Sequence, residues 1–593
     1  MKHAKTVFTP QLLLSGPRRS PGVPNPSGTT VLFTTSSYSF QEHSQKTTLQ
    51  ALRVQSGETI DLAVNQDISH INWLDDERFV CLRSEKDGRT SLLHAAFGGT
   101  SNNSDEPISF RSAGIINASV NGMKTARIDH DRDDFAVVIS APACRNGKLY
   151  TPADAAQKRN STGRLYDSLF VRHWDRYEGP DENSLWYGKL SSVCGSQYEL
   201  SHLTNLLADT NMECPIRPFG GSDQFDVRKD AVIWVAKDPE LNRSWNTTCK
   251  IFIRHIDSWA PEEDPTESDI RQIDVAGLDG AATSPVFAPT GDKAAFLVMR
   301  KNRYEADKNQ IVVVKDVKAT QLEIVRAFCS SEQNQFEGGW DRSPSSICFA
   351  ADGESLIVIA EDQAYGRVFF IRGEEITGHG IPRPLTTHGT AEVVRCLPDG
   401  RVFVSGTSTV DDSWYLMTHS LAEIVSTPTD ILPKAAWSHS NSDQGEKLGL
   451  QRSQISCIWT PASNPEITAK VHSWIFKPST FDKTKRYPVA YLIHGGPHAA
   501  WKDSWSTRWN PAVFAEQGYI VVAPNISGST GFGQAFTDSS FRNWGGDPYH
   551  DLENVFQWVG QNVEGADNER AVALGHSFGG FMVGHQPRFY DRE

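Results

Sequence analysis

A serine lies between glycines near the end of the sequence, in the stretch Gly575-His576-Ser577-Phe578-Gly579. This G-x-S-x-G pattern is typical of a nucleophilic serine that stands on a sharp turn between a strand and a helix. Small residues on both sides permit such a turn because they leave room for the backbone to double back. The stretch therefore predicts covalent catalysis, in which the Ser577 hydroxyl attacks a carbonyl carbon. A structural glycine-rich turn is the alternative, since so short a motif also arises by chance.

A second glycine-rich stretch could stabilise the negative charge that such an attack places on the carbonyl oxygen. Backbone N–H groups stabilise such a charge, and one of them belongs to the residue after the nucleophile, here Phe578. The second donor comes from a loop that follows a buried strand. His494-Gly495-Gly496 directly follows the apolar run 487–493, so we expect this loop to supply it.

The sequence contains no comparable motif for metal or phosphate chemistry. His494 and His498 are four residues apart, but they lie in a Gly-Pro loop and no H-E-x-x-H pattern accompanies them. The glycine-rich stretch 528–534 lacks the lysine and the spacing of a phosphate-binding loop. We therefore expect no metal ion and no cofactor.

Strand and helix patterns alternate ahead of Ser577. Strands are predicted in "AKVHSWIFKP", "YPVAYLIHGG", "YIVVAPN" and "RAVALG", and helices in "NPAVFAEQGY" and in residues 547–563. In the second helix, one face carries the apolar residues Leu552, Val555, Phe556 and Val559. Buried strands that alternate with helices indicate a parallel α/β sheet, and the last strand leads straight into the serine turn.

The longer first part of the chain, from about residue 20 to 430, follows another pattern. Seven segments, among them "NPSGTTVLFTTSS", "FDVRKDAVIWVAK" and "FAADGESLIVIAE", join a polar turn to a β-branched or aromatic run. Each predicts two strands around a tight turn. Most turns lie roughly 45 to 65 residues apart, which is typical of propeller blades, with Trp174, Trp234 and Trp414 in the core. The longer interval from Asp131 to Lys229 leaves room for one more blade, and a pair of β-sandwiches is the alternative.

Composition limits the partners and the compartment. The net charge of −14 argues against nucleic acid, because phosphate binding needs a basic face. The sequence has no run of 18 apolar residues, so we expect no membrane span. The first 20 residues are a poor signal peptide, although six N-x-[ST] sequons occur. The nine cysteines are scattered, and their spacing predicts no disulfide pairing.

The motifs together resemble those of the prolyl oligopeptidase family of serine peptidases. The resemblance rests on "HGGPHAAWKDSWSTRWNP", "GYIVVAPNISGSTGFGQAFTD", "NWGGDPYHDL" and "GHSFGGFM", and on propeller segments such as "YDSLFVRHWDRYEG". It implies a β-propeller that caps an α/β-hydrolase domain, small peptides as substrates, and release of dipeptides from a free N-terminus. It also implies that Ser577 is the nucleophile, that the N–H groups of Gly496 and Phe578 are the oxyanion donors, and that the protein is secreted, with the cytoplasm as the alternative.

The corresponding domains are a β-propeller of about seven blades in residues 1–440 and an α/β-hydrolase domain in residues 441–593. In the family the acid and the base of the triad follow the serine, but only sixteen residues follow Ser577 here. His585 would lie on the helix behind the serine, and Asp547 and Asp551 precede it. We therefore expect a hydrolase domain that is incomplete at its C-terminus, lacks the catalytic Asp and His, and is nearly inactive as written.

Three functions remain open from the sequence. The first is a serine peptidase that releases dipeptides, and the second is an acylaminoacyl-peptidase or esterase with the same motifs. The third is a propeller that binds other proteins and carries no catalytic activity. A site for a substrate ammonium group would need a carboxylate, and the sequence does not single one out among Glu178, Asp223 and the others. The oligomeric state is also left open.

Overall fold

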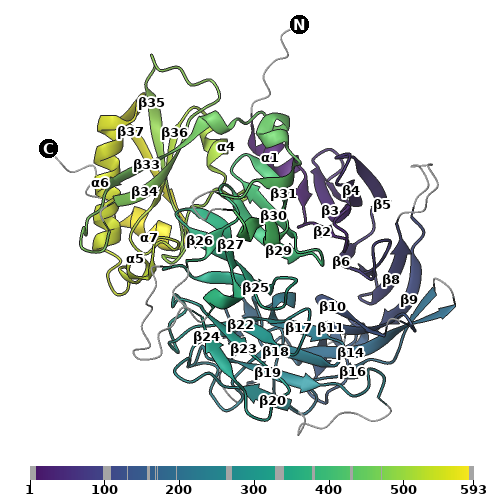
Figure 1. Ribbon diagram of the computed structural model, residues 1–593. Helices are drawn as coiled ribbons and strands as arrows, with labels where there is room; N and C mark the ends of the chain where they lie inside the picture. The colour runs from purple at the N-terminus through teal and green to yellow at the C-terminus, as the bar shows by residue number, and fades with distance from the viewer. Residues whose placement is uncertain are drawn as a thin grey trace.

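In the described residues of the computed structural model, seven antiparallel sheets of four or five strands each surround a common axis (Figure 1). The structure describes residues 8–97, 108–129, 131–156, 161–166, 169, 171–194, 197–261, 270–327, 340–376, 381–427, 432–468 and 470–585. The predicted propeller of about seven blades is therefore confirmed. The seven sheets are numbered below in chain order.

The first four sheets contain four or five strands each, between two and fourteen residues long. Sheet 1 holds β1 (Arg18–Arg19), β2 (Val23–Pro24), β3 (Thr30–Ser39), β4 (Ser44–Arg53) and β5 (Thr59–Val64). Sheet 2 holds β6 (Ile68–Trp73), β7 (Arg78–Ser84), β8 (Thr90–Ala96) and β9 (Arg111–Ile116). Sheet 3 holds β10 (Gly122–Asp129), β11 (Asp134–Cys144), β14 (Asp181–Cys194) and β15 (Gln197–Leu200), with β16 (Thr204–Asn205) beside β14. Sheet 4 holds β17 (Phe225–Arg228), β18 (Ala231–Lys237), β19 (Cys249–His255) and β20 (Ile270–Ile273).

The remaining three sheets continue the ring. Sheet 5 holds β21 (Ala282–Phe287), β22 (Ala294–Val298), β23 (Gln310–Val314) and β24 (Ile324–Arg326). Sheet 6 holds β25 (Pro344–Phe349), β26 (Leu356–Asp362), β27 (Tyr365–Ile371) and β28 (Arg383–Pro384). Sheet 7 holds β29 (Thr390–Cys396), β30 (Val402–Ser408), β31 (Asp411–Thr418) and β32 (Ala435–Ser440). Short helices η1 (Ser222–Gln224), η3 (Gly373–Glu375) and α3 (Leu421–Val425) lie in the connections.

Each sheet is buried on both faces because it lies between two neighbours. In β18 and β30 nearly every residue is buried, as a strand sandwiched between two apolar layers requires. Sheets 1 and 7 close the ring through a cluster that includes Phe33 and Tyr415 and through the 2.5 Å ion pair of Arg19 with Asp412. Seven apolar clusters, one at each boundary between sheets, therefore hold the ring together.

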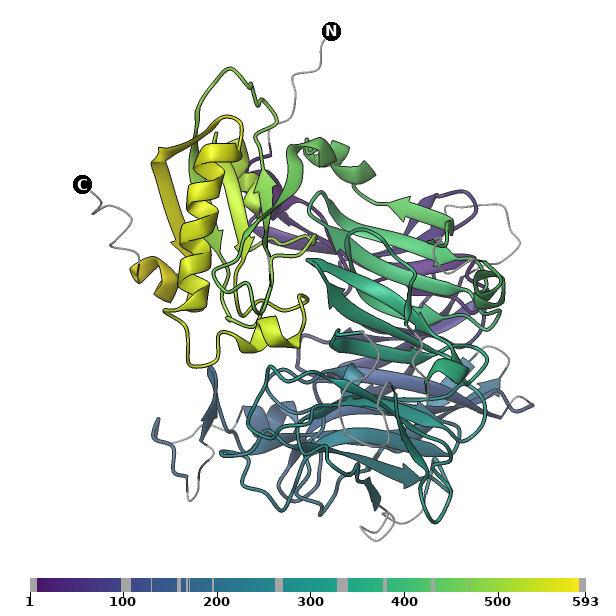
Figure 2. The same ribbon diagram turned by 60° about the vertical axis from the view of Figure 1, so that its left-hand side comes forward.

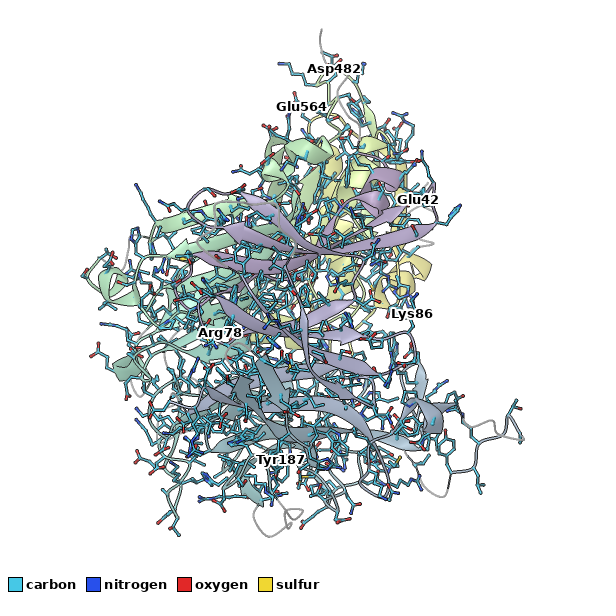
Figure 3. All side chains as sticks on the ribbon, turned by 90° about the vertical axis from the view of Figure 1, so that its right-hand side faces the viewer. Glu42, Arg78, Lys86, Tyr187, Asp482 and Glu564 are labelled. Atoms are coloured by element: carbon cyan, nitrogen blue, oxygen red, sulfur yellow. The ribbon has the colours of Figure 1, made fainter. Side chains whose placement is uncertain are left out.

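Polar bonds reinforce some of these boundaries. Arg78 of β7, which Figure 3 labels, donates to the Asp133 carboxylate at 2.6 Å and to the Tyr198 hydroxyl at 2.5 Å. Both partners belong to sheet 3, so the guanidinium joins sheets 2 and 3. Burial alone would raise the pKa of the Asp133 carboxyl. The hydrogen bonds from Tyr198, Arg78 and Arg127 together have the larger effect, so this pKa lies below its usual value. Asp133 is therefore ionised at neutral pH and pairs with Arg78 as a carboxylate.

In the described part of the long interval after Asp131, the chain forms an insertion and no further blade. The insertion lies between β11 and β14 of sheet 3 and contains α2 (Pro152–Ala155) and the hairpin of β12 (Arg172–His173) and β13 (Arg176–Tyr177). Trp174 lies at the tip of this hairpin and is 68% exposed, so its predicted place in the propeller core is wrong. Trp234 of β18 is fully buried and Trp414 of β31 is half-buried. A hairpin tip has no neighbouring sheet to cover it, which explains the exposure of Trp174.

The C-terminal sheet has the order β33-β34-β36-β35-β37. Its strands are β33 (Ile455–Pro461), β34 (Lys470–Phe476), β35 (Tyr487–Ile493), β36 (Ile520–Asn525) and β37 (Ala566–Gly575). β35 is parallel to β36 and to β37, as predicted, whereas β34 is antiparallel to both of its neighbours. The parallel prediction is thus wrong for β34, which forms a hairpin with the unpredicted β33 and needs no crossover helix. Among the described strands, β37 pairs with β35 alone and forms the edge of the sheet.

Helices cover this sheet on both sides, with α6 (Asp547–Asn562) in front in Figure 2. The predicted apolar face of α6 is confirmed: Leu552, Val555 and Val559 are buried, and Phe556 packs on the same cluster. The other elements are α4 (Pro511–Glu516), α5 (Gln534–Asp538), α7 (Phe578–Gly584), η4 (Asp443–Leu448) and η5 (Arg452–Gln454). The N-terminal helix α1 (Pro10–Ser15) and Phe8 pack against Ala512 of α4 and against Val410.

Buried carboxylates join the C-terminal sheet to sheets 6 and 7. Asp503, which is fully buried, accepts bonds from Gly389 N at 3.0 Å and from Thr409 N and Oγ1, both at 2.9 Å. Arg452 donates to the same carboxylate at 2.8 Å. Glu361 of β26 accepts from Lys502 at 2.7 Å and also from the Thr530 hydroxyl. The C-terminal part therefore rests on one side of the propeller through charged hydrogen bonds.

Replacing Asp503 by alanine should destabilise the protein, because three buried donors and the Arg452 guanidinium lose their acceptor. We expect the free energy of unfolding to fall by about 2–4 kcal/mol. Asp482→Ala is the matched control, since Asp482 is exposed and bonds only within its own turn (Figure 3). Chemical denaturation of both variants measures the difference. Equal stability of the two variants would show that Asp503 does not join the two parts.

Candidate active site

Ser577 stands on the predicted turn between β37 and α7. Its backbone has φ 57° and ψ −122°, a conformation that residues other than glycine rarely adopt. The side chain is exposed, and among the described residues the hydroxyl has no hydrogen-bond partner. The turn therefore presents the hydroxyl to solvent at the end of the strand, where a nucleophile could meet a substrate.

Two glycines make this turn possible. A Cβ atom on Gly579 would lie 2.1 Å from the Ile493 carbonyl oxygen, and a Cβ atom on Gly575 would lie 2.3 Å from the carbonyl carbon of Gly579. Both distances are far below any real contact, so neither position accepts a side chain. The start of α7 consequently crosses the ends of β35 and β37 in direct backbone contact.

The loop Gly495-Gly496 lies beside the serine. A Cβ atom on Gly495 would be 3.4 Å from Ser577 Cβ and 4.0 Å from Ser577 Oγ. Gly496 follows with φ 128°, which favours glycine. The N–H groups of Gly496 and Phe578 have no hydrogen-bond acceptor among the described residues. The structure thus brings the loop that holds Gly496 next to the turn that holds Ser577 and Phe578. These are the three predicted site residues.

His494 and His498 shape the glycine loop and do not converge on one point. The ring of His494 is buried, with Nε2 at 3.0 Å from Ser529 Oγ and Nδ1 at 2.8 Å from the Gly495 carbonyl oxygen. His498 Nε2 lies 3.2 Å from Ser540 Oγ. Burial lowers the pKa of both imidazoles, so both are neutral at pH 7. Each ring therefore serves as a hydrogen-bonding support for the loop.

No carboxylate or imidazole among the described residues bonds to Ser577. Asp551 is fully buried and accepts bonds from Ser463 N and from the backbone and hydroxyl of Ser527. Asp547 accepts from Asn464 at 3.1 Å. Both carboxylates therefore hold loops at the start of α6, in agreement with their exclusion from the triad.

Histidines near the serine are also directed elsewhere. The His585 ring stacks on Phe581 at a centroid distance of 4.1 Å, at the far end of α7. The His576 ring lies 6.0 Å from that of Trp509. Asp591, the other residue considered as a substitute, lies outside the described residues. Within the described chain, the serine accordingly has a supporting turn and free N–H groups but no base.

Aromatic residues from both parts of the chain lie near the glycine loop and α7, and no sequence motif indicates them. Tyr304, from the loop between β22 and β23 of the propeller, donates to Asp538 of α5 at 2.5 Å. Its ring contacts His498 and Phe541 at centroid distances of 6.2 and 5.9 Å. Burial and the bond to Asp538 raise the pKa of Tyr304, so the hydroxyl stays protonated and donates. These partners lie more than 190 residues from Tyr304 in the sequence, and no local pattern links them.

A second aromatic group packs on α7, the helix that follows the serine. The Trp544 ring, 43% exposed, meets Phe578 at 5.2 Å and Phe581 at 5.5 Å. Phe541, whose ring contacts that of Tyr304, is 59% exposed. Exposed aromatic rings next to a candidate nucleophile offer an apolar surface for a substrate side chain.

Comparison with known proteins places the chain among peptidases. The sequence pattern of the prolyl oligopeptidase family matches residues 505–587. The probable dipeptidyl-peptidase 5 of Trichophyton verrucosum is 35% identical over 582 residues, which cover 97% of this chain and 75% of the relative. The dipeptidyl-peptidase 5 of Aspergillus fumigatus is 35% identical over 586 residues, with coverage of 97% and 76%.

Solved structures with a similar fold have lower sequence identity. The acylaminoacyl peptidase of Pyrococcus horikoshii aligns with a TM-score of 0.67 and 11% identity, over 98% of this chain and 77% of that one. A puromycin-hydrolysing peptidase of Mycobacterium tuberculosis aligns with a TM-score of 0.57 and 14% identity, over 98% and 78%. These similarities confirm the predicted fold class, a β-propeller followed by an α/β-hydrolase domain.

Gly579→Ala should disrupt the serine turn, because the new methyl group would overlap the Ile493 carbonyl oxygen. We expect a loss of about 2–4 kcal/mol in the free energy of unfolding. Gly584→Ala, at the end of the same helix, is the matched control, since a Cβ atom there meets nothing within 4 Å. Its expected change is below about 1 kcal/mol. If both variants unfold like the parent chain, the backbone crossing at Gly579 is looser than described.

Proposed function

The chain belongs to the prolyl oligopeptidase family of serine peptidases, and we propose that it releases dipeptides from the free N-terminus of peptides through an acyl-enzyme. The observation that supports this proposal is the position of Ser577: an exposed hydroxyl on a strained turn, beside a glycine loop with an unpaired N–H group. The names of the relatives, dipeptidyl-peptidase 5, support dipeptides as the product.

The proposed reaction begins with attack of Ser577 Oγ on the carbonyl carbon of the second substrate residue. The N–H groups of Phe578 and Gly496 donate to the oxygen as it becomes negative, and they lower the barrier because they need no reorientation. Collapse of the intermediate expels the remaining peptide as an amine and leaves the dipeptide esterified to the serine. Water then hydrolyses the ester and releases the dipeptide.

The proton of Ser577 must be transferred to a base in the first step. Among the described residues no group is placed to accept it. Oxyanion donors and substrate binding alone accelerate such a reaction by roughly a thousandfold over water. We therefore propose that the 593-residue polypeptide by itself cleaves peptides slowly, and that full activity requires an acid and a base in the positions that the family uses.

The domain division and the compartment are also proposals. We place the boundary of the propeller at residue 440, where β32 ends, so that residues 1–440 form the gating domain and residues 441–593 the peptidase domain. Of the helices in the described chain, none combines the length and the apolar composition that crossing a bilayer requires. Secretion is supported by the resemblance and by exposed sequon residues Asn117 and Asn242, whereas Asn525 is buried in β36 and cannot accept a glycan in the folded protein.

The proposal predicts which peptides are cleaved. The test uses the chain extended at its C-terminus by a segment of a family member that supplies the acid and the base. We expect this protein to release dipeptides from peptides with a free N-terminus, and Ser577→Ala to lower the rate by about a thousandfold or more. Mass spectrometry of the products measures both results.

Blocking the substrate N-terminus distinguishes the alternatives. N-acetylated peptides of the same sequence should resist cleavage, because the proposed activity requires a free ammonium group. Equal cleavage of acetylated and free peptides would contradict dipeptide release and favour an acylaminoacyl-peptidase. Absence of any cleavage by the extended protein, with binding retained, would favour the non-catalytic propeller.

A further inference from the structure

Two cysteine thiols meet at the boundary between sheets 6 and 7. The sulfur atoms of Cys348 and Cys396 are 3.4 Å apart, and the two residues are separated by 48 positions in the sequence. Cys348 lies near the end of β25 and Cys396 at the end of β29, the first strands of their sheets. The two thiols thus occupy similar positions in neighbouring blades.

This boundary depends mainly on side-chain packing. One parallel pair of residues, Gly366 and Thr390, connects the two sheets along the backbone. The rest of the described contact consists of an apolar cluster that includes Val368, Phe370 and Val394, with both cysteines packed against it. In addition, Arg383 of β28 donates to the Ile424 carbonyl and to Thr427, which follow β31. A covalent bond between the thiols would therefore join two blades at a place where few backbone bonds do so.

We propose that Cys348 and Cys396 form a reversible disulfide that cross-links sheets 6 and 7 of the propeller. The thiols are in van der Waals contact, and a disulfide bond of about 2.05 Å requires the sulfur atoms to approach by roughly 1.4 Å. Rotations about the Cα–Cβ bonds can supply a movement of this size. Among the described cysteines no other pair of sulfur atoms is in contact, which makes this pairing specific.

The oxidant that the proposal requires is a low-molecular-weight disulfide such as oxidised glutathione. One thiol loses its proton to water, and its thiolate attacks the oxidant, which forms a mixed disulfide and releases one glutathione thiolate. The second cysteine then loses its proton and attacks the protein sulfur of the mixed disulfide, which releases the second glutathione. Two protein thiols are oxidised, and one glutathione disulfide is reduced to two thiols.

The surroundings of the two thiols determine whether an oxidant can reach them. The contact with Cys348, together with burial, raises the pKa of Cys396, so Cys396 has little thiolate at neutral pH. Both side chains are half-buried, and Ser345 and Glu392 on the same two strands are exposed. A small oxidant can therefore approach the pair, whereas Cys81, Cys214 and Cys249 are buried.

The cross-link would act on the blades that carry the C-terminal part. Sheet 6 supplies Glu361, which accepts a bond from Lys502. Thr409 of sheet 7 and Gly389, in the turn before that sheet, both donate to Asp503. Joining the two sheets would make this support stiffer. It would also stabilise the folded ring, because the closed loop between residues 348 and 396 restricts the unfolded chain. The inference is independent of the proposed peptidase activity.

Peptide mapping without reduction tests the pairing on the folded 593-residue chain. After equilibration with oxidised glutathione, we expect one cross-linked peptide pair that contains Cys348 and Cys396. The midpoint of thermal unfolding should rise by a few degrees relative to the reduced protein. Recovery of both residues as free thiols, or each with its own glutathione, would overturn the proposal.

Two variants provide the controls. In Cys396→Ser, oxidation should no longer raise the midpoint of thermal unfolding, and Cys348 should carry a single glutathione. In Cys457→Ser the shift should persist, because Cys457 is exposed and contacts no other thiol among the described residues. If Cys396→Ser does not fold, Cys348→Ser tests the same point, and a shift that survives in either variant of the pair would contradict the cross-link.

Discussion

No side chain fits where the start of α7 crosses the ends of β35 and β37, and the rest of the site depends on this crossing. Gly579 touches the Ile493 carbonyl, and Gly575 touches Gly579. The backbone between these two glycines has to reverse direction within a few residues, which leaves Ser577 with a positive φ. The parallel pairing of β35 with β37 sets Ile493 opposite Gly575 and so determines the place of the crossing. The same pairing brings the loop after β35 to the serine.

The propeller supports this arrangement from one side. Its sheets are held by apolar clusters at every boundary, and the C-terminal part attaches to sheets 6 and 7 through the carboxylates of Asp503 and Glu361. Tyr304 extends the contact to Asp538, close to the glycine loop. Tyr304 therefore brings the propeller next to the loop that borders Ser577.

The sequence predicted the elements with strong local patterns and missed those that depend on distant contacts. The serine turn, the apolar face of α6 and the strands before Ser577 were predicted correctly, because glycine spacing and apolar periodicity are local properties. The antiparallel direction of β34 and the exposed hairpin at Trp174 were not, since each depends on which element lies next to it. The contacts of Tyr304 with α5 and of Cys348 with Cys396 join residues that no local pattern connects.

We propose that Ser577 is a nucleophile that the described chain supports with a turn and two N–H donors but not with a base. The rate of phosphonylation by a fluorophosphonate probe tests it most directly. We expect slow labelling of the 593-residue polypeptide and labelling faster by about a thousandfold or more when a family C-terminal segment is added, with the adduct mapped to Ser577. Fast labelling of the 593-residue form, or labelling of the extended form that persists in Ser577→Ala, would contradict the account.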